Sequence, residues 1–182
     1  MNLRTRVPAA VTAALSIVAL AVAPAAAVRA AYDDPADASA SLSDIRHVSV
    51  KHGPTRVKLH VRFTELRRTS DGGPASLAIL LDTRTDRTGP EFRLVSGLQE
   101  GMDYQLVRMK HGKPVGEPLT CAHDVRLDFA ANVLAFTVDR TCLDDPGRVR
   151  IGVRMRDEYD GSHPVTDWLG APRSYTGWLA SD

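Results

Sequence analysis

The chain has 182 residues, and its 23 basic residues nearly balance its 22 acidic ones, which gives a formal net charge of +1. Such a balance gives no argument for nucleic-acid binding, which relies on a clear excess of positive charge. About 150 residues remain after a predicted export signal is removed, enough for one domain with a real core.

The first thirty residues have the layout of a secretory signal peptide. Arg4 and Arg6 precede an apolar stretch, and small residues at Ala27 and Ala30 give two cleavage points that fit the small-x-small rule. We favour the cut after Ala30, which removes residues 1–30. The apolar stretch is shorter than the roughly 20 residues of a membrane-spanning helix, which argues against a retained anchor.

Removing residues 1–30 also removes three arginines, so 20 basic residues remain against 22 acidic ones. The mild basicity of the whole chain therefore belongs to the export signal. No later apolar run is comparable, so the processed protein is expected to be secreted, extracellular and without a membrane anchor. We expect a monomer that does not bind nucleic acid.

The only two cysteines, Cys121 and Cys142, both lie in the exported part. In an oxidising compartment an isolated pair usually forms a disulfide, and a loop of this size then gains roughly 3 kcal/mol of stability. The alternative is two free thiols. Sulfurs paired for stability are poor nucleophiles, so the pair does not indicate cysteine catalysis.

The first strand candidates follow a lead at 31–43 that is expected to be disordered. Residues 56–63 alternate strictly between apolar and basic side chains, and this period of two is typical of a half-buried strand. Residues 45–52 form a second candidate, joined to the first through Gly53 and Pro54. Together the two predict a hairpin.

The rest of the chain also favours strands over helices. Residues 77–81 are apolar on both faces and too short for a helix, which fits a central buried strand. Further candidates lie at 91–97, 103–109, 124–129, 133–138, 148–156 and 173–179. Short strands separated by Gly, Pro, Asp and Asn turns predict an all-β fold: an antiparallel, jelly-roll-like β-sandwich of about eight or nine strands. One domain, at 44–182, is predicted.

The polar loop that follows 77–81 is the first candidate site. It contains Asp82, Asp86 and Glu91, and calcium takes six to eight oxygen ligands, of which such a loop supplies two or three. Two arginines lie between these acids and tend to neutralise them, and Asp and Thr also begin ordinary turns. Calcium is the one cofactor that the sequence admits, and a plain turn is the favoured alternative.

A second polar segment, at 157–167, is rich in acids and includes Ser162 and His163. An extracellular hydrolase could use these groups, but neighbours in one loop do not easily converge as nucleophile, base and orienting acid. The sequence has no Gly-x-Ser-x-Gly elbow and no zinc-binding histidine spacing. We therefore expect a protein without catalytic activity, with the hydrolase as the alternative.

Aromatic residues are few, and four of them, Tyr159, Trp168, Tyr175 and Trp178, cluster near the end of the chain. Flat rings can stack on the C–H faces of sugars, which makes all four candidate ligand-binding residues. The favoured alternative is that the two tryptophans close one end of the core.

The segments 56–63 and 148–156 each carry a face rich in Arg, Lys or His. Side by side, the two faces would form a cationic stripe for anionic envelope polymers or acidic polysaccharides, to which arginine can make bidentate contacts. The favoured alternative is ordinary cross-strand ion pairs with acidic strands such as 124–129.

Three segments carry a resemblance to known proteins: LAILLDT at 77–83, DYQL at 103–106 and YDGSHPVTDWLG at 159–170. In this strand order they resemble small secreted β-sandwich proteins of actinobacteria, and the layout of residues 44–179 is similar to DOMON domains and family 9 carbohydrate-binding modules. The resemblance implies sugar or haem binding, in some members with structural calcium. We therefore expect a secreted, non-catalytic binding or envelope-associated module, with a cell-envelope or extracellular polysaccharide as partner.

Overall fold

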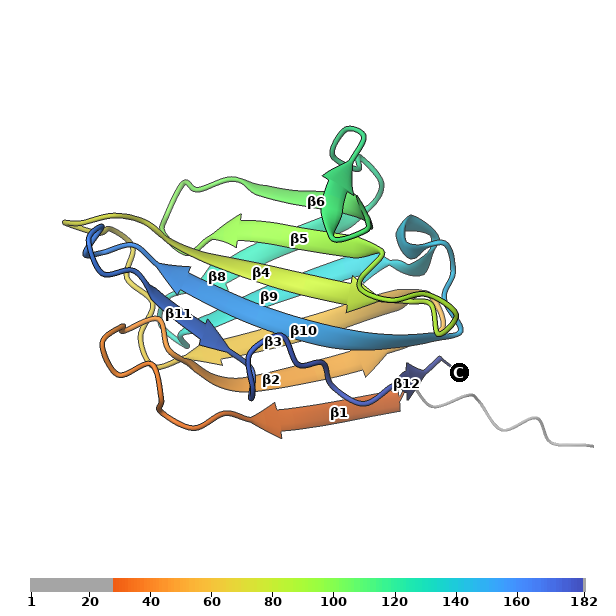
Figure 1. Cartoon of the computed structure of the whole chain (residues 1–182), viewed down its shortest axis with the longest axis horizontal. Helices are drawn as coiled ribbons and strands as arrows, with labels where there is room; N and C mark the ends of the chain where they lie inside the picture. The colour runs from red at the N-terminus through yellow and green to blue at the C-terminus, as the bar shows by residue number, and fades with distance from the viewer. Residues whose placement is uncertain (1–27, 182) are drawn as a thin grey trace, which may run out of the picture.

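The structure is a computed structural model, and it describes residues 28–181. Twelve β-strands and one short 3-10 helix, η1 (Arg140–Leu143), make up this part of the chain (Figure 1). The strands are β1 (Val28–Asp33), β2 (Ile45–His52), β3 (Arg56–Phe63), β4 (Ala75–Asp82), β5 (Phe92–Gly97), β6 (Tyr104–Lys110), β7 (Lys113–Val115), β8 (His123–Asp128), β9 (Val133–Asp139), β10 (Arg148–Asp157), β11 (Val165–Trp168) and β12 (Leu179–Ala180).

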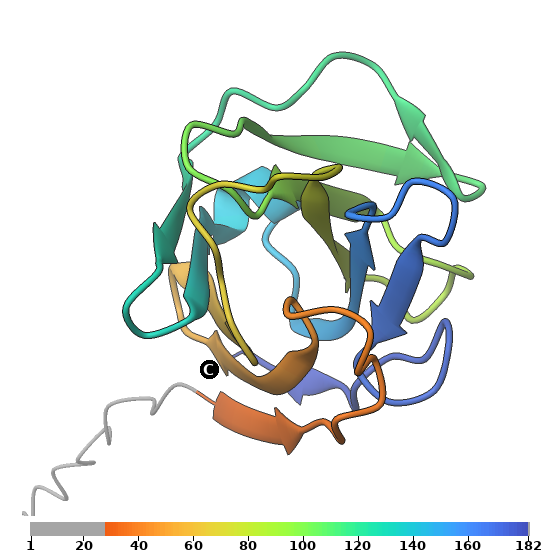
Figure 2. The ribbon, with the colours of Figure 1, turned by 90° about the vertical axis from the view of Figure 1, so that its left-hand side faces the viewer.

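The strands form two antiparallel sheets that face each other across one core (Figure 1, Figure 2). The five-stranded sheet has the order β1-β2-β3-β9-β8, and the seven-stranded sheet has the order β11-β10-β4-β5-β6-β7, with β12 paired to β10. The chain passes from one sheet to the other after β3, after β7 and after β9. The prediction of an antiparallel β-sandwich is confirmed, with more strands than expected.

The alternation of apolar and polar side chains decides what lies between the sheets. In β3 every apolar residue is buried and every basic residue is exposed. The register sets Leu59 opposite Phe136 in the five-stranded sheet, and it aligns Ile151, Leu81 and Phe92 across the other. All five side chains are 0 % exposed. Burying a side chain of this size contributes about 1.5–3 kcal/mol, so these rows hold the sheets together.

Eight predicted strands and the hairpin through Gly53 and Pro54 are confirmed, with bounds that shift by no more than two residues. The ninth, at 173–179, is wrong for most of its length, because only Leu179 enters a strand. Residues 169–178, the C-terminal tail, run irregularly along β10 between its pairings with β11 and β12. The amide of Ile151 donates to the hydroxyl of Thr176 at 2.9 Å. A side chain thus replaces the backbone carbonyl that a regular ladder would use.

The lead at 31–43, predicted to be disordered, is ordered. Its first residues belong to β1, where Ala30 and Tyr32 pack against the core. Residues 34–44, the strap, then cross from β1 to β2. The hydroxyl of Ser41 donates to Asp157 at 2.5 Å. The strap is polar, and its order comes from bonds to segments distant in sequence. Its composition therefore gave no indication that it is ordered.

The disulfide between Cys121 and Cys142 is confirmed. It joins the segment just before β8 to η1, which follows β9. The sulfurs therefore close the hairpin of these two strands at one end of the five-stranded sheet.

The predicted export signal lies almost wholly outside the described residues, but its last three positions fall in β1. Val28, Arg29 and Ala30 pair with His52, Lys51 and Val50. A cut after Ala30 would remove three of the six residues of β1, and that stretch of β2 would keep only its pairing with β3.

We therefore predict that cleavage follows Ala27, which leaves β1 whole. Amino-terminal sequencing of the protein exported from a bacterial host should return Val28 as the first residue. A mature chain that begins at Ala31 would contradict this prediction.

Candidate functional site

Asp82, the first of the predicted calcium ligands, is bound by an arginine. The carboxylate is fully buried, and Arg150 donates to its Oδ2 from Nε at 2.8 Å and from Nη2 at 2.6 Å. The two residues lie opposite each other in the register of β4 and β10, so their side chains share the outer face of the sheet. Hydrogen bonds between charged partners of this kind are short and strong.

The other two predicted ligands have different partners. Asp86 is exposed and accepts two hydrogen bonds from Arg84, at 3.0 and 2.7 Å, which hold the pKa of its carboxyl below the usual value. Glu91 accepts from the amide of Thr83 at 2.9 Å. The structure does not bring these three carboxylates to a common point. The loop is built as a turn, the alternative that the sequence favoured.

Arg150 also holds the C-terminal tail. Its guanidinium carbon lies 5.0 Å from the ring centre of Tyr175 and 4.8 Å from that of Trp178. Gly152 leaves the room for this arrangement, because a Cβ there would come within 3.3 Å of the Tyr175 ring. The buried Asp82 therefore positions an arginine on which two aromatic rings of the tail rest.

We expect Arg150→Met to lower the free energy of unfolding by about 3 kcal/mol, because it leaves the buried Asp82 carboxylate without its partner. Urea denaturation measures this loss. The matched control is Arg84→Met, which breaks the exposed pair with Asp86 and should leave the midpoint unchanged. Equal midpoints for both variants would show that Asp82 and Arg150 do not anchor the tail.

A pocket of about 460 Å³ opens on the outer face of the seven-stranded sheet. Ala78 and Leu80 on β4 form its floor, and Arg93 on β5, Arg154 on β10 and Arg173 on the tail surround it. The register explains the convergence, since Arg154 lies opposite Ala78 and Arg93 lies opposite Leu80. We call this feature the arginine pocket.

Positive charge in the arginine pocket is not compensated. No acidic side chain occurs among the described residues that line it. Burial, followed by repulsion from Arg93 and Arg156, lowers the pKa of Arg154. In residues 28–181, the Nε atom of Arg93 is buried without a hydrogen-bond partner. An anion with oxygen acceptors in the pocket would compensate this positive charge.

Of the four predicted aromatic ligands, the structure brings two into the arginine pocket. Trp168 and Tyr175 line it, and the Trp168 ring centre lies 5.7 Å from the guanidinium carbon of Arg154. Trp178 lies on Arg150 instead. Tyr159 is 52 % exposed and lies beside Arg67, outside the pocket. The two tryptophans were predicted either to bind a ligand together or to close one end of the core together. In the structure they differ: Trp178 packs on Arg150, and Trp168 lines an open pocket.

The polar loop at 157–167 brings a serine, a histidine and an acid into contact, contrary to the expectation from their spacing. Ser162 Oγ lies 2.9 Å from His163 Nδ1, and the same nitrogen lies 3.1 Å from Asp160 Oδ2. A catalytic triad needs the acid on one ring nitrogen and the nucleophile on the other. The His163 side chain is also 84 % exposed. This contact is a loop-stabilising network rather than a relay.

The two basic strand faces do not form one stripe. β3 belongs to the five-stranded sheet and β10 to the seven-stranded sheet, so their polar faces point to opposite sides of the sandwich. A hollow of about 500 Å³ on the β3 side is lined by Arg29, Lys51, Lys58 and His60. Among the described residues, its lining contains no phenylalanine, tyrosine or tryptophan.

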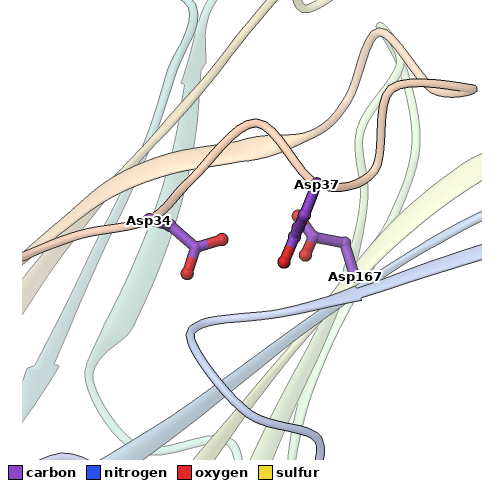
Figure 3. Close-up of side chains that lie close together, drawn as sticks. All are labelled: Asp34, Asp37 and Asp167. Atoms are coloured by element: carbon purple, nitrogen blue, oxygen red, sulfur yellow. The ribbon is translucent and has the colours of Figure 1, made fainter.

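Three carboxylates that the sequence analysis did not group meet at one edge of the sandwich. Asp34 and Asp37 come from the strap, and Asp167 comes from β11 (Figure 3). One oxygen from each lies within 4.8 Å of the others. Within residues 28–181, this is the only group of three such side chains close enough to share a metal ion. We call it the acidic cluster.

Two members of the acidic cluster are buried, with exposed fractions of 5 % for Asp34 and 3 % for Asp167. Burial, with repulsion from the neighbouring aspartates, raises the pKa of Asp167 to about 6, although the amide of Ile45 donates to it at 2.7 Å. Burial also raises the pKa of Asp34. The neighbouring Arg46 pairs with Asp44 at 3.2 Å, so negative charge accumulates here.

The sequence did not predict the acidic cluster, because its three aspartates were assigned to two different segments of the chain. Asp167 stood in the polar segment at 157–167, while Asp34 and Asp37 stood in a lead predicted to be disordered. The local signal was the run Asp-Pro-Ala-Asp at 34–37. In the structure this run forms a tight turn in which the amide of Asp37 donates to the carbonyl of Pro35 at 3.0 Å.

A scan against protein-family models finds no match, and searches of the curated proteins and of the solved structures find none either. What the structure has in common with the layout of DOMON and family 9 domains is a two-sheet antiparallel sandwich. Residues 28–181 contain no helix with the length and apolarity to cross a membrane.

Proposed function

We propose that the protein is a secreted, non-catalytic binding module that holds an acidic glycan in the arginine pocket. The observation that carries this proposal is the convergence of Arg93, Arg154 and Arg173 beside Trp168 and Tyr175, with no acid in the described lining. Each element has a separate role in recognition. The arginines bind carboxylate or sulfate oxygens, and the rings cover the apolar face of a sugar.

The shape of the arginine pocket supports a small or linear ligand. Its volume of about 460 Å³ falls in the range typical of small-molecule sites. The pocket is open to solvent along a sheet face, so one unit of a chain can enter while its neighbours continue across the surface. Regular strands carry Arg93 and Arg154, which reduces the entropy lost on binding.

The disulfide supports the extracellular part of the proposal. Disulfides persist in oxidising compartments and are rare in the cytosol. An envelope or extracellular polysaccharide bearing uronic acid or sulfate groups is the class of partner that the charge and rings of the pocket fit.

We expect a glycan array to give binding to acidic and not to neutral glycans. In solution, trigalacturonic acid should bind to the purified protein, while a neutral galactose trisaccharide should not, as measured by isothermal titration calorimetry. Arg154→Ala should weaken the binding at least about tenfold, because a hydrogen bond between charged groups contributes about 1.5–3 kcal/mol. Trp168→Ala should weaken it several-fold through loss of the ring face.

The matched control is Lys58→Ala, which removes a positive charge from the opposite face of the sandwich. Its affinity should equal that of the unmodified protein. Equal weakening by Lys58→Ala and Arg154→Ala would indicate unspecific attraction to a charged polymer. Absence of binding to every acidic and neutral glycan on the array would remove the proposal.

A further inference from the structure

We propose that the acidic cluster is a calcium site: Asp34, Asp37 and Asp167 together bind one Ca²⁺ ion that fastens the strap to β11. This inference does not depend on the glycan proposal, because it concerns the opposite surface of β11 and other residues. It also differs from the calcium site that the sequence admitted in the Asp82 loop, whose carboxylates have other partners.

The positions of the oxygens suit one ion. Calcium binds oxygen ligands at about 2.3–2.6 Å, so two ligands of one ion lie no more than about 5 Å apart. One oxygen from each carboxylate meets this condition, with all of them within 4.8 Å of one another. The three side chains face a common space between the strap and β11 (Figure 3).

A second observation, independent of the clustering, points to a missing partner. Asp34 is 5 % exposed, and its Oδ1 accepts the amide of Gly170 at 2.6 Å. Its Oδ2 is buried and has no hydrogen-bond partner within residues 28–181. A buried carboxylate oxygen without a donor is costly. A cation in the acidic cluster would remove that cost.

The donors favour calcium over other metals. All three are hard carboxylate oxygens, without the sulfur or imidazole that zinc prefers. Asp34 and Asp167 each use one oxygen for a backbone amide, so each has one left for an ion. Asp37 is exposed, and water can complete the coordination on that side. Calcium tolerates such an irregular shell, whereas magnesium requires a nearly regular octahedron.

Bound calcium would join the two sheets at their edge. The strap follows β1, the edge strand of the five-stranded sheet, and β11 is the edge strand of the seven-stranded sheet. Asp34 and Asp167 already contribute one hydrogen bond each across this junction. The ion would replace repulsion among the three carboxylates by attraction to a shared charge, so the strap should become more rigid.

Thermal melting of the purified full domain in chelator and in calcium chloride tests the proposal. At a hundredfold excess of calcium over its dissociation constant, the melting temperature should rise by about 5–10 °C. Calorimetric titration should give one ion per chain, and hydrogen exchange of residues 34–44 should slow. Magnesium chloride at the same concentration should give a smaller rise.

Three variants locate the ion. Asp37→Asn alters an exposed side chain, so the protein should fold normally and lose most of the calcium-dependent rise. Asp167→Asn can still accept the amide of Ile45, and in chelator it should melt no lower than the unmodified protein, because a buried charge is gone. The control Asp86→Asn, in the Asp82 loop, should keep the full rise.

Two results would overturn the proposal. One is a melting temperature that is the same in chelator and in calcium, with no heat of binding. The other is a calcium-dependent rise that survives Asp37→Asn and Asp167→Asn but disappears in Asp86→Asn. Neither result tests the glycan proposal itself, which is measured with Arg154→Ala on β10, in the arginine pocket.

Discussion

The contact between Asp82 and Arg150 is the constraint on which the outer surface of the seven-stranded sheet depends. A fully buried carboxylate holds the guanidinium from below, and Tyr175 and Trp178 rest on that guanidinium from above. The tail would otherwise be an irregular segment along β10 with few backbone bonds. Because Tyr175 and Arg173 belong to this tail, one wall of the arginine pocket rests in part on the pair of Asp82 and Arg150.

Strand β11 links the two candidate sites through the alternation of its side chains. Asp167 points inward, toward the strap, while the next residue, Trp168, points outward and lines the arginine pocket. Successive residues of a strand face opposite sides, so one short strand serves both sites. An ion that fixes Asp167 against the strap would therefore also fix the backbone that carries Trp168. The position of a wall of the ligand pocket would then depend on an interaction on the opposite side of the sheet.

The sequence predicted the strands and turns, whose signals repeat over a few residues. It did not predict the features that depend on contacts between residues far apart in the chain. Strict alternation located β3 and β10, and turn residues located the hairpin of β2 and β3, because these signals act within about ten residues. The tail contains Tyr175, Thr176 and Trp178, residue types common in strands, and its sequence looked like a strand, but the hydroxyl of Thr176 interrupts its pairing. Asp82 looked like a metal ligand because its partner is 68 residues away. Asp34 was overlooked because its partner Gly170 is 136 residues away.

In this protein, charged residues that have a partner of opposite charge stabilise the fold, whereas charged residues without such a partner gather at the candidate sites. With 23 basic and 22 acidic residues, the chain has enough opposite charges for nearly every group to find a partner. Asp82, Asp86 and Asp144 each lie against an arginine, and these carboxylates serve the fold. Within residues 28–181, the two candidate sites depart from this rule: three arginines share an apolar floor, and three aspartates share one edge. Uncompensated charge of one sign lowers the stability of a fold unless a ligand of the opposite sign is bound. The two departures have opposite signs, so the same physical argument assigns an anion to one side of β11 and a cation to the other.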